Sequence, residues 1–191
     1  MSEWKGIVGE AFGPDAFDAY CSALQWTSWR PSLIVLHNTA SPSLAQRPEG
    51  FTQQHIHNLE SYYRDQQHWS AGPHVFVDDL QVWVFTPLTV SGIHSPSWNK
   101  TALGVEMLGN YDTEQFDVGR GLKVRQNAVQ AMCTLCGVLG LDPSSIRLHR
   151  EDPLTTHACP GKNVRKLEVI QDVQDCLVIS HPGEHLAEPG S

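Results

Sequence analysis

The sequence predicts a single α/β domain of the α+β kind, with a central mixed β-sheet flanked by helices. The chain has 191 residues, of which 40% are hydrophobic, and this is enough for one substantial core. Short apolar runs typical of strands are mixed with stretches of helical periodicity. The sequence contains no internal repeat, low-complexity block or long linker that would mark a second domain.

The first third of the chain is predicted to contain two helices and one strand. Residues 14–24 begin with Pro14 and carry apolar side chains at spacings of three and four, which indicates a short amphipathic helix. Residues 32–37 are mostly apolar and indicate a buried strand. After a loop rich in Pro and Ser at residues 41–50, the apolar side chains of residues 51–64 recur on one helical face.

The middle of the chain is predicted to form three strands and the longest helix. Residues 74–77 and 81–85 flank a short polar turn and indicate a β-hairpin. Residues 103–108 are another apolar strand. Residues 123–139 carry a long apolar stripe at helical spacing, and Gly140 is a typical residue to end such a helix.

The last part of the chain is predicted to contain a short extended piece at residues 146–149 and a helix at residues 164–177. Two Pro and two Gly in residues 180–191 indicate a loose tail. We therefore expect a helical N-terminal extension packed on the domain (residues 1–30), a catalytic domain (residues 31–179) and the tail.

The composition argues against several kinds of partner. A net charge of −8 and a pI near 5.6 do not suit a nucleic-acid-binding protein, which normally has a basic face. An acidic surface also gives no attraction to anionic membranes or wall polymers, so such a polymer would have to bind in a local groove. Residues 1–10 lack the apolar core of a secretion signal, and no stretch is long enough to span a bilayer. We expect a monomer that is kept in the cytoplasm.

The five cysteines predict no disulfide framework, because their number is odd and no secretion signal is evident. Cys133 and Cys136 lie within the apolar stripe of the long helix, and no second cysteine pair follows. They are expected to be small buried side chains, and a redox or metal-binding pair is the alternative.

Three residues far apart in the sequence form a candidate metal site. His37 ends the first apolar strand, His149 ends a second short strand, and Cys159 lies in a turn that is predicted to open a helix near Asn163. Either histidine alone is also compatible with an ordinary structural or surface role. Two imidazoles and one thiolate form a zinc ligand set that leaves a fourth position open, as in catalytic sites.

Four segments, in this order, resemble the motifs of the zinc-dependent N-acetylmuramoyl-L-alanine amidases. That family includes amidase-type phage lysozymes, the AmpD enzymes and the peptidoglycan recognition proteins. The likeness runs from about Leu33 to Lys166. The segments are Val35-Leu36-His37-Asn38-Thr39-Ala40, Ala71-Gly72-Pro73-His74-Val75-Phe76-Val77, Leu103-Gly104-Val105-Glu106-Met107 and, between residues 148 and 161, Leu148-His149-Arg150 with Ala158-Cys159-Pro160-Gly161.

The resemblance implies one zinc ion per chain, held by His37, His149 and Cys159 at the edge of a mixed sheet. It also implies hydrolysis of the amide bond between N-acetylmuramic acid and L-alanine in bacterial peptidoglycan or muropeptides. We expect a phage or prophage endolysin that reaches the wall through a holin. A cytoplasmic recycling amidase and a secreted antibacterial effector remain alternatives. A non-catalytic peptidoglycan-binding protein is a further alternative, although the resemblance implies that non-catalytic members of the family lack the cysteine ligand. A protein in which the zinc has only a structural role is the last alternative.

Two residues are candidates for proton transfer. Glu106 is the only charge in an apolar strand, and apolar neighbours raise a carboxyl pKa as a proton shuttle requires. The alternative is a glutamate that points to solvent. The sequence departs from the family in two places: Pro73 replaces a tyrosine, and His157 replaces a lysine. Protonated His157 could stabilise the oxyanion, which predicts a loss of rate at high pH, or it could be an extra ligand.

Four further residues are candidates for substrate binding. His74 lies in the hairpin motif, where packing beside the site is the more ordinary role. His94, Trp98 and Asn99 lie on a loop that matches the groove wall of the family, and they could contact glycan or stem peptide. The alternative for Trp98 is packing beneath that loop.

Overall fold

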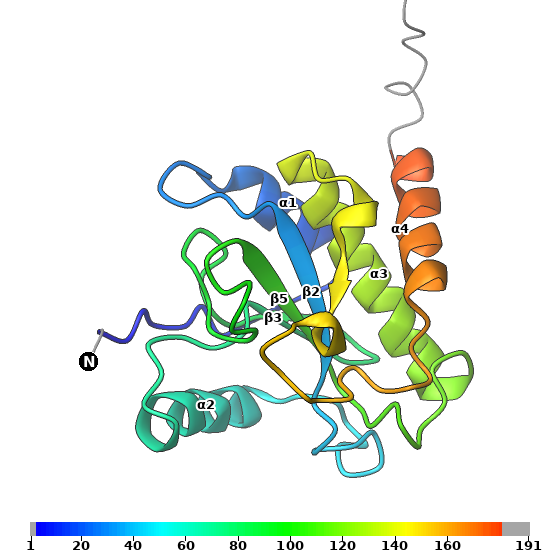
Figure 1. The fold of residues 1–191 in the computed structure, drawn as a ribbon, viewed down its shortest axis with the longest axis horizontal. Coiled ribbons are helices and arrows are strands. Elements are labelled where there is room, and N and C mark those ends of the chain that lie inside the picture. The colour runs from blue at the N-terminus through cyan, green and yellow to red at the C-terminus, as the bar shows by residue number, and fades with distance from the viewer. Residues whose placement is uncertain (1–2, 181–191) are drawn as a thin grey trace, which may run out of the picture.

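A six-stranded mixed sheet forms the centre of the protein in the computed structural model, which describes residues 3–180 (Figure 1). The strand order is β1-β4-β3-β5-β2-β6. Strands β2, β5 and β6 run parallel, as do β3 and β5, and β4 is antiparallel to both β1 and β3. The strands are β1 (Glu10–Phe12), β2 (Leu33–Asn38), β3 (Val75–Val77), β4 (Val82–Val84), β5 (Ala102–Met107) and β6 (Arg147–Leu148).

Helices lie on both sides of this sheet. Helices α1 (Pro14–Ala23), α3 (Gly119–Leu139) and α4 (Lys166–Ser180) pack together, and α2 (Gln53–Ser61) lies apart from them across the sheet (Figure 1). A π-helical turn, Tyr62–Gln66, continues α2. The fold class predicted from the sequence, a central mixed sheet flanked by helices in one domain, is confirmed.

Several element bounds differ from the prediction; helix α2, for example, spans Gln53–Ser61 rather than residues 51–64. Strand β1 was not predicted because it has only three residues; it adds an edge strand from within the expected helical extension. Helix α3 begins at Gly119 rather than residue 123, because glycines obscured its first turn. A Cβ at Gly121 would collide with the backbone of Gln115, so the helix start packs against the preceding loop. Helix α4 begins at Lys166, and the predicted tail from residue 181 onward lies outside the described residues.

The expectation that Cys133 is only a small buried side chain is wrong. Cys133 on α3 and Cys176 on α4 form a disulfide, with their Cα atoms 6.1 Å apart. The two residues are 43 positions apart, and only the packing of α3 on α4 brings them together. Cys136 is free and buried, as predicted.

The two faces of β5 differ: the side chains on one face pack in the core, and Glu106 on the other face lines the cleft. Leu103, Val105 and Met107 are fully buried in the core, on one side of the strand. Glu106 points to the other side, and the strand register aligns it with His37 on β2 and Phe76 on β3. One row of side chains across three neighbouring strands therefore forms a floor on the face opposite the core helices. Within residues 3–180, none of the helices combines the length and apolar character needed to cross a membrane.

Candidate metal centre and cleft

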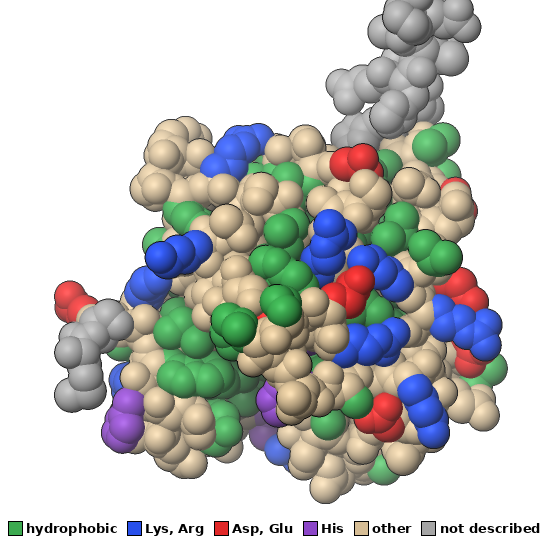
Figure 2. Space-filling model, viewed as in Figure 1, with side chains coloured by type: hydrophobic (Ala, Val, Ile, Leu, Met, Phe, Trp, Pro, Cys, Tyr) green, Lys and Arg blue, Asp and Glu red, His purple; other side chains and the backbone are tan. Residues whose placement is uncertain are grey.

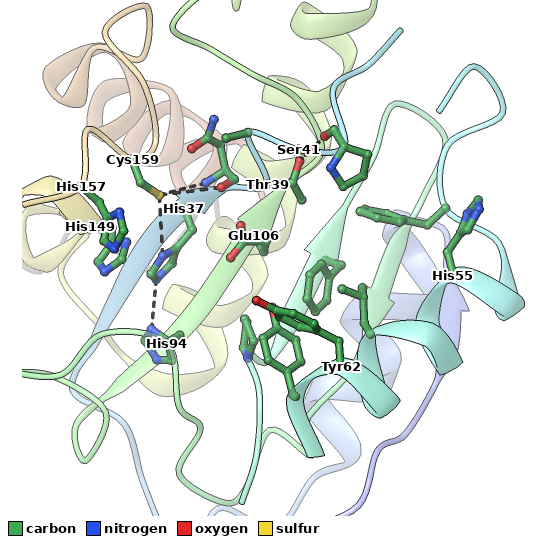
Figure 3. Close-up of a pocket in the computed structure, with 18 of the residues that line it drawn as sticks. His37, Thr39, Ser41, His55, Tyr62, His94, Glu106, His149, His157 and Cys159 are labelled. Carbon is green, nitrogen blue, oxygen red and sulfur yellow. Dashed lines mark hydrogen bonds between the residues drawn. The ribbon is translucent and has the colours of Figure 1, made fainter. Parts of the chain in front are cut away.

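The three metal-ligand candidates predicted from the sequence meet at one end of the sheet. Ligand atoms of His37, His149 and Cys159 all lie within 4.8 Å of one another (Figure 3). The His37 Nδ1 atom is 3.8 Å from Cys159 Sγ, and the rings of His37 and His149 are 4.4 Å apart between centroids. Spacing of this kind suits three ligands around one small cation.

Local structure explains why these distant residues converge. Strand β6 pairs with β2, so His149, directly after β6, lies beside His37 at the end of β2. The Arg150 backbone N–H then donates to Cys159 O at 2.7 Å, and its guanidinium donates to Gly161 O at 2.6 Å. Gly161 has φ +103°, and a Cβ there would come within 2.5 Å of the Tyr111 backbone. Arg150 and Gly161 therefore hold the cysteine turn against the end of the sheet.

A hydrogen-bonded chain beneath His37 determines which of its nitrogens is free. His94 Nε2 lies 3.1 Å from Ala102 O, and because a carbonyl only accepts, His94 Nε2 must carry the proton. Burial lowers the pKa of His94 to about 4, so its ring is neutral and its Nδ1 accepts from His37 Nε2 at 3.0 Å. The His37 Nδ1 lone pair is therefore left free to face Cys159 and a metal ion.

The loop that carries His94 is rigidly attached to the metal-ligand segment. Asn99 Oδ1 accepts the backbone N–H groups of His94 and Ser95, both at 2.7 Å. The buried carboxylate of Asp152, close after His149, accepts from the hydroxyls of Ser95 and Ser97, both at 2.5 Å. Burial raises the pKa of Asp152, but these hydrogen bonds outweigh it and hold the pKa at about 2.

The structure thus gives the predicted substrate-binding residues different surroundings. His94 lines the cleft only at its base, where it supports His37, and Asn99 orders the loop; neither Asn99 nor Trp98 lines the cleft. His74 is fully buried and stacks on Trp29 with 5.4 Å between centroids. Both of its nitrogens are engaged, since Nδ1 accepts from Gly104 N and Nε2 donates to Val90 O.

Cys159 is held by the backbone and not by a helix N-terminus. The predicted helix begins only at Lys166, too far along the chain to stabilise a thiolate. Burial and the nearby Glu106 carboxylate raise the pKa of the Cys159 thiol, and the Asn38 N–H, 3.2 Å from Sγ, lowers it only in part. By contrast, burial followed by the charges of His94 and His149 lowers the pKa of His37. Two neutral imidazoles and a thiol that needs a cation to ionise are a donor set that fits zinc.

Glu106 lies on the cleft floor beside the ligand cluster (Figure 3). Burial raises the pKa of Glu106 to about 8, in the direction predicted from its apolar strand. Its carboxylate accepts no hydrogen bond from residues 3–180. Tyr63, which the sequence analysis did not single out, also lines the cleft, and burial followed by the charge of Glu106 raises its pKa well above the usual value. The Tyr63 ring lies against Gly72, where a Cβ would be 2.9 Å from a ring carbon.

His157 lies at the exposed rim of the ligand cluster. Its ring stacks on that of His149, with centroids 5.6 Å apart. It is not part of the group of ligand atoms formed by His37, His149 and Cys159 within the described residues. His157 is therefore placed to face a ligand in the cleft from outside the cluster.

The cleft that begins at this cluster has a volume of about 610 Å³ and extends to α2. Figure 2 shows apolar side chains gathered in the hollow beside α2. His55 and Asn58 come from α2, and Arg47 comes from the loop before it. None of these three residues was singled out in the sequence analysis. The apolar lining residues on this side are Phe51, Leu59, Tyr62, Tyr63, Trp69, Pro73 and Phe76.

Known proteins of similar sequence and fold agree with this arrangement. Residues 27–162 match the family model of N-acetylmuramoyl-L-alanine amidases. The chain is 24% identical to peptidoglycan-recognition protein SC2 of Drosophila melanogaster over 135 residues, and this alignment covers 70% of each of the two chains.

Solved structures share the fold at low sequence identity. The endolysin amidase LysCS from Clostridium intestinale has a TM-score of 0.60 and 21% identity, covering 77% of this chain and 86% of its own. A point mutant of Drosophila PGRP-LB, solved in complex with tracheal cytotoxin, has a TM-score of 0.60 and 15% identity over 85% and 84% of the two chains. The family model spans most of this chain, so the protein belongs to the N-acetylmuramoyl-L-alanine amidase family.

Proposed function

We propose that this protein is a zinc-dependent hydrolase that cleaves the amide between N-acetylmuramic acid and L-alanine in bacterial peptidoglycan. The observation that carries the proposal is the meeting of His37, His149 and Cys159 beside Glu106, at one end of a long cleft. Membership of the amidase family supports the substrate class. A zinc ion bound there would supply a Lewis acid that acidifies water and polarises the amide carbonyl.

The residues around the cluster suit the proton transfers of amide hydrolysis. Glu106, whose pKa burial raises to about 8, accepts the proton of the attacking water and returns it to the leaving nitrogen. Tyr63, like any tyrosine, keeps its proton at neutral pH, and burial raises its pKa further, so its hydroxyl can donate a hydrogen bond to the developing oxyanion. Protonated His157 is a second candidate for that role. His94 keeps His37 in the tautomer that binds metal.

The biological setting that we favour is that of a phage or prophage endolysin. The likeness to the Clostridium intestinale endolysin amidase supports it. In this proposal the protein acts as a monomer, is made in the host bacterial cytoplasm and reaches the wall after holin-type release. A recycling amidase and a secreted effector would use the same chemistry on a different form of the substrate. A binding module would have no use for Glu106 and the cysteine in one cleft.

Digestion of purified peptidoglycan, followed by mass analysis of the products, tests the reaction. We expect new L-alanine N-termini, whereas new reducing sugar ends would identify a glycosidase and contradict the proposal. Parallel digests of intact sacculi and soluble muropeptides distinguish a lytic enzyme from a recycling one. The Glu106→Gln variant serves as the control for contaminating hydrolases.

A further inference from the structure

The residues before β1 do not line the cleft, but they are bonded to the elements that form its wall. The Val8 N–H donates to Phe85 O at 2.8 Å and the Gly9 N–H donates to Val84 O at 2.9 Å, so this part of the chain runs along β4 (dark blue in Figure 1). We call residues 4–9 the N-terminal segment. The proposed reaction gives this segment no role.

The N-terminal segment is hydrogen-bonded on both sides of the stretch that carries Tyr63. That stretch consists of α2 and the π-helical turn after it. At its start, Gln53 Nε2 donates to Gly9 O at 3.0 Å. Beyond its end, Ser70 O accepts the Lys5 N–H at 2.8 Å. The segment therefore connects the first residue of α2 with the residues that follow the turn.

Aromatic packing connects the N-terminal segment to the Tyr63 ring. Tyr63 stacks on Trp69 with 5.3 Å between centroids and meets Phe85 edge-on at 5.8 Å. Phe85 is fully buried and also meets the Trp4 ring edge-on, at 6.4 Å. The Tyr63 hydroxyl has no hydrogen-bond partner within residues 3–180, so the packing of these rings determines where it points.

Two side chains anchor the N-terminal segment itself. The Lys5 ammonium donates to O and Oγ of Ser91 at 2.6 and 2.8 Å. Trp4 is partly buried against the core, although its Nε1 is enclosed without a hydrogen-bond partner in the described part of the chain. An enclosed N–H without a partner lowers stability, so the packing of the Trp4 ring, and not a polar bond, holds it in place.

The wall that carries Tyr63 needs such an anchor because α2 lies apart from the core helices (Figure 1). A donor stabilises an oxyanion only within about 2.7–3.1 Å of it. A displacement of about 1 Å, even one caused by a change far from the reacting atoms, can lower a rate by about 100-fold. The position of the Tyr63 ring therefore matters for the proposed reaction as much as its hydroxyl does.

We infer that the N-terminal segment is a positioning element of the active site: through Trp4 and Phe85 it holds the Tyr63 ring where the hydroxyl can reach the oxyanion. This inference rests on the proposed function, in which Tyr63 donates that hydrogen bond. Trp4 does not touch the substrate and acts only through Tyr63. No hydrogen bond or ring contact within residues 3–180 joins the segment to a metal ligand, so zinc binding does not depend on it.

Kinetics of Trp4→Ala with a soluble muropeptide test the inference. We expect kcat to fall by roughly 10- to 100-fold, the scale for a displaced group. KM and zinc affinity should stay unchanged, because the lost hydrogen bond is made only in the transition state. Trp4→Phe keeps a ring against Phe85 and should restore most of kcat. In Tyr63→Phe, adding Trp4→Ala should have little further effect, since both changes remove one interaction.

Trp26→Ala is the matched control. Trp26 is also partly buried, but its indole N–H donates to Cys21 O on α1, among the core helices. Its loss should lower stability without changing kcat. If Trp4→Ala does not fold, Trp4→Leu takes its place, because it keeps an apolar side chain against Phe85, and the expected fall in kcat is then smaller.

NMR of the substrate-free protein with carbon-13-labelled tyrosine separates this inference from the proposed function. The Tyr63 ring signal is assigned by its absence in Tyr63→Phe, and the neighbouring rings of Trp69 and Phe85 shift it. In Trp4→Ala it should move toward the position of a free tyrosine, and in Trp26→Ala it should not. A signal that moves supports the positioning role even if no peptide is hydrolysed, in which case the amidase proposal fails alone.

Two results would overturn the inference. One is a Tyr63 signal that stays in place in Trp4→Ala. The other, in a protein that hydrolyses the muropeptide, is an unchanged kcat in Trp4→Ala or a full additional loss when Trp4→Ala is combined with Tyr63→Phe.

Discussion

Replacing His94 by leucine tests whether the buried chain beneath His37 prepares the metal site. The substitution removes the acceptor of the His37 Nε2 proton, which His94 Nδ1 now provides at 3.0 Å. It also removes the donor to Ala102 O. His37 would then either keep a buried N–H without a partner or move its proton to Nδ1, the atom that faces the metal.

The magnitude follows from the cost of an unsatisfied buried donor. That cost is about 1–3 kcal/mol, which corresponds to roughly 5- to 150-fold in affinity. We therefore expect zinc binding to weaken by about 10- to 100-fold, the usual effect of removing a partner of a metal-bound histidine. Competition with a calibrated chelator measures this loss without reference to activity.

Two further variants separate positioning from general damage to the fold. His94→Gln restores an acceptor for His37 and should recover most of the zinc affinity. His74→Gln replaces an equally buried histidine that is not bonded to His37, and it should leave zinc affinity unchanged. Nitrogen-15 NMR of the metal-free protein should show the His37 proton on Nε2 in the wild type and a mixture of tautomers in His94→Leu. Unchanged zinc affinity and an unchanged tautomer in His94→Leu would refute the reasoning.

Three other predictions follow from the same geometry. Glu106→Gln should lower turnover by roughly 10²–10⁴-fold while the zinc content is retained; a rate near that of the wild type would assign proton transfer to another group. Tyr63→Phe should lower kcat and leave zinc affinity unchanged, and a normal kcat measured with soluble muropeptides would exclude the hydroxyl from the reaction. Asp152 has a folded-state pKa of about 2, below its unfolded value, so its hydrogen bonds stabilise the fold fully above the unfolded pKa. This contribution to the free energy of unfolding, on the order of 2 kcal/mol, is lost as the pH falls through the folded pKa. In Asp152→Asn, the free energy of unfolding, measured by denaturant titration at a series of pH values, should therefore fall less steeply toward acid pH than in the wild type. The same pH dependence in both proteins would contradict this.

The metal ligands and the main elements could be predicted from the sequence because their signals are local. His37 ends an apolar strand, and the segment from His149 to Cys159 carries a recognisable motif. Parallel pairing of β6 with β2 then brings the two together, as motifs at strand ends commonly do. The strand alternation around Glu106 likewise indicated a carboxylate apart from the core.

The remaining features depend on contacts between distant segments, which one sequence does not reveal. His94 resembles a loop residue in the sequence, but Gly104 leaves room for its ring, since a Cβ there would lie 2.6 Å from it. His55 on α2 and Arg47 in the loop before it line the cleft, on the side of the sheet away from the core helices (Figure 1). The link from Cys133 to Cys176 depends on helix packing in the same way.

Zinc titration of the chelator-treated protein tests the central claim most directly. The zinc added per chain is compared with the L-alanine N-termini released from purified peptidoglycan. We predict that activity returns in proportion to zinc and reaches its plateau at one ion per chain, and that Cys159→Ala remains folded but inactive over the same range. Full release of L-alanine termini by the metal-free protein, or by Cys159→Ala without zinc, would contradict the account.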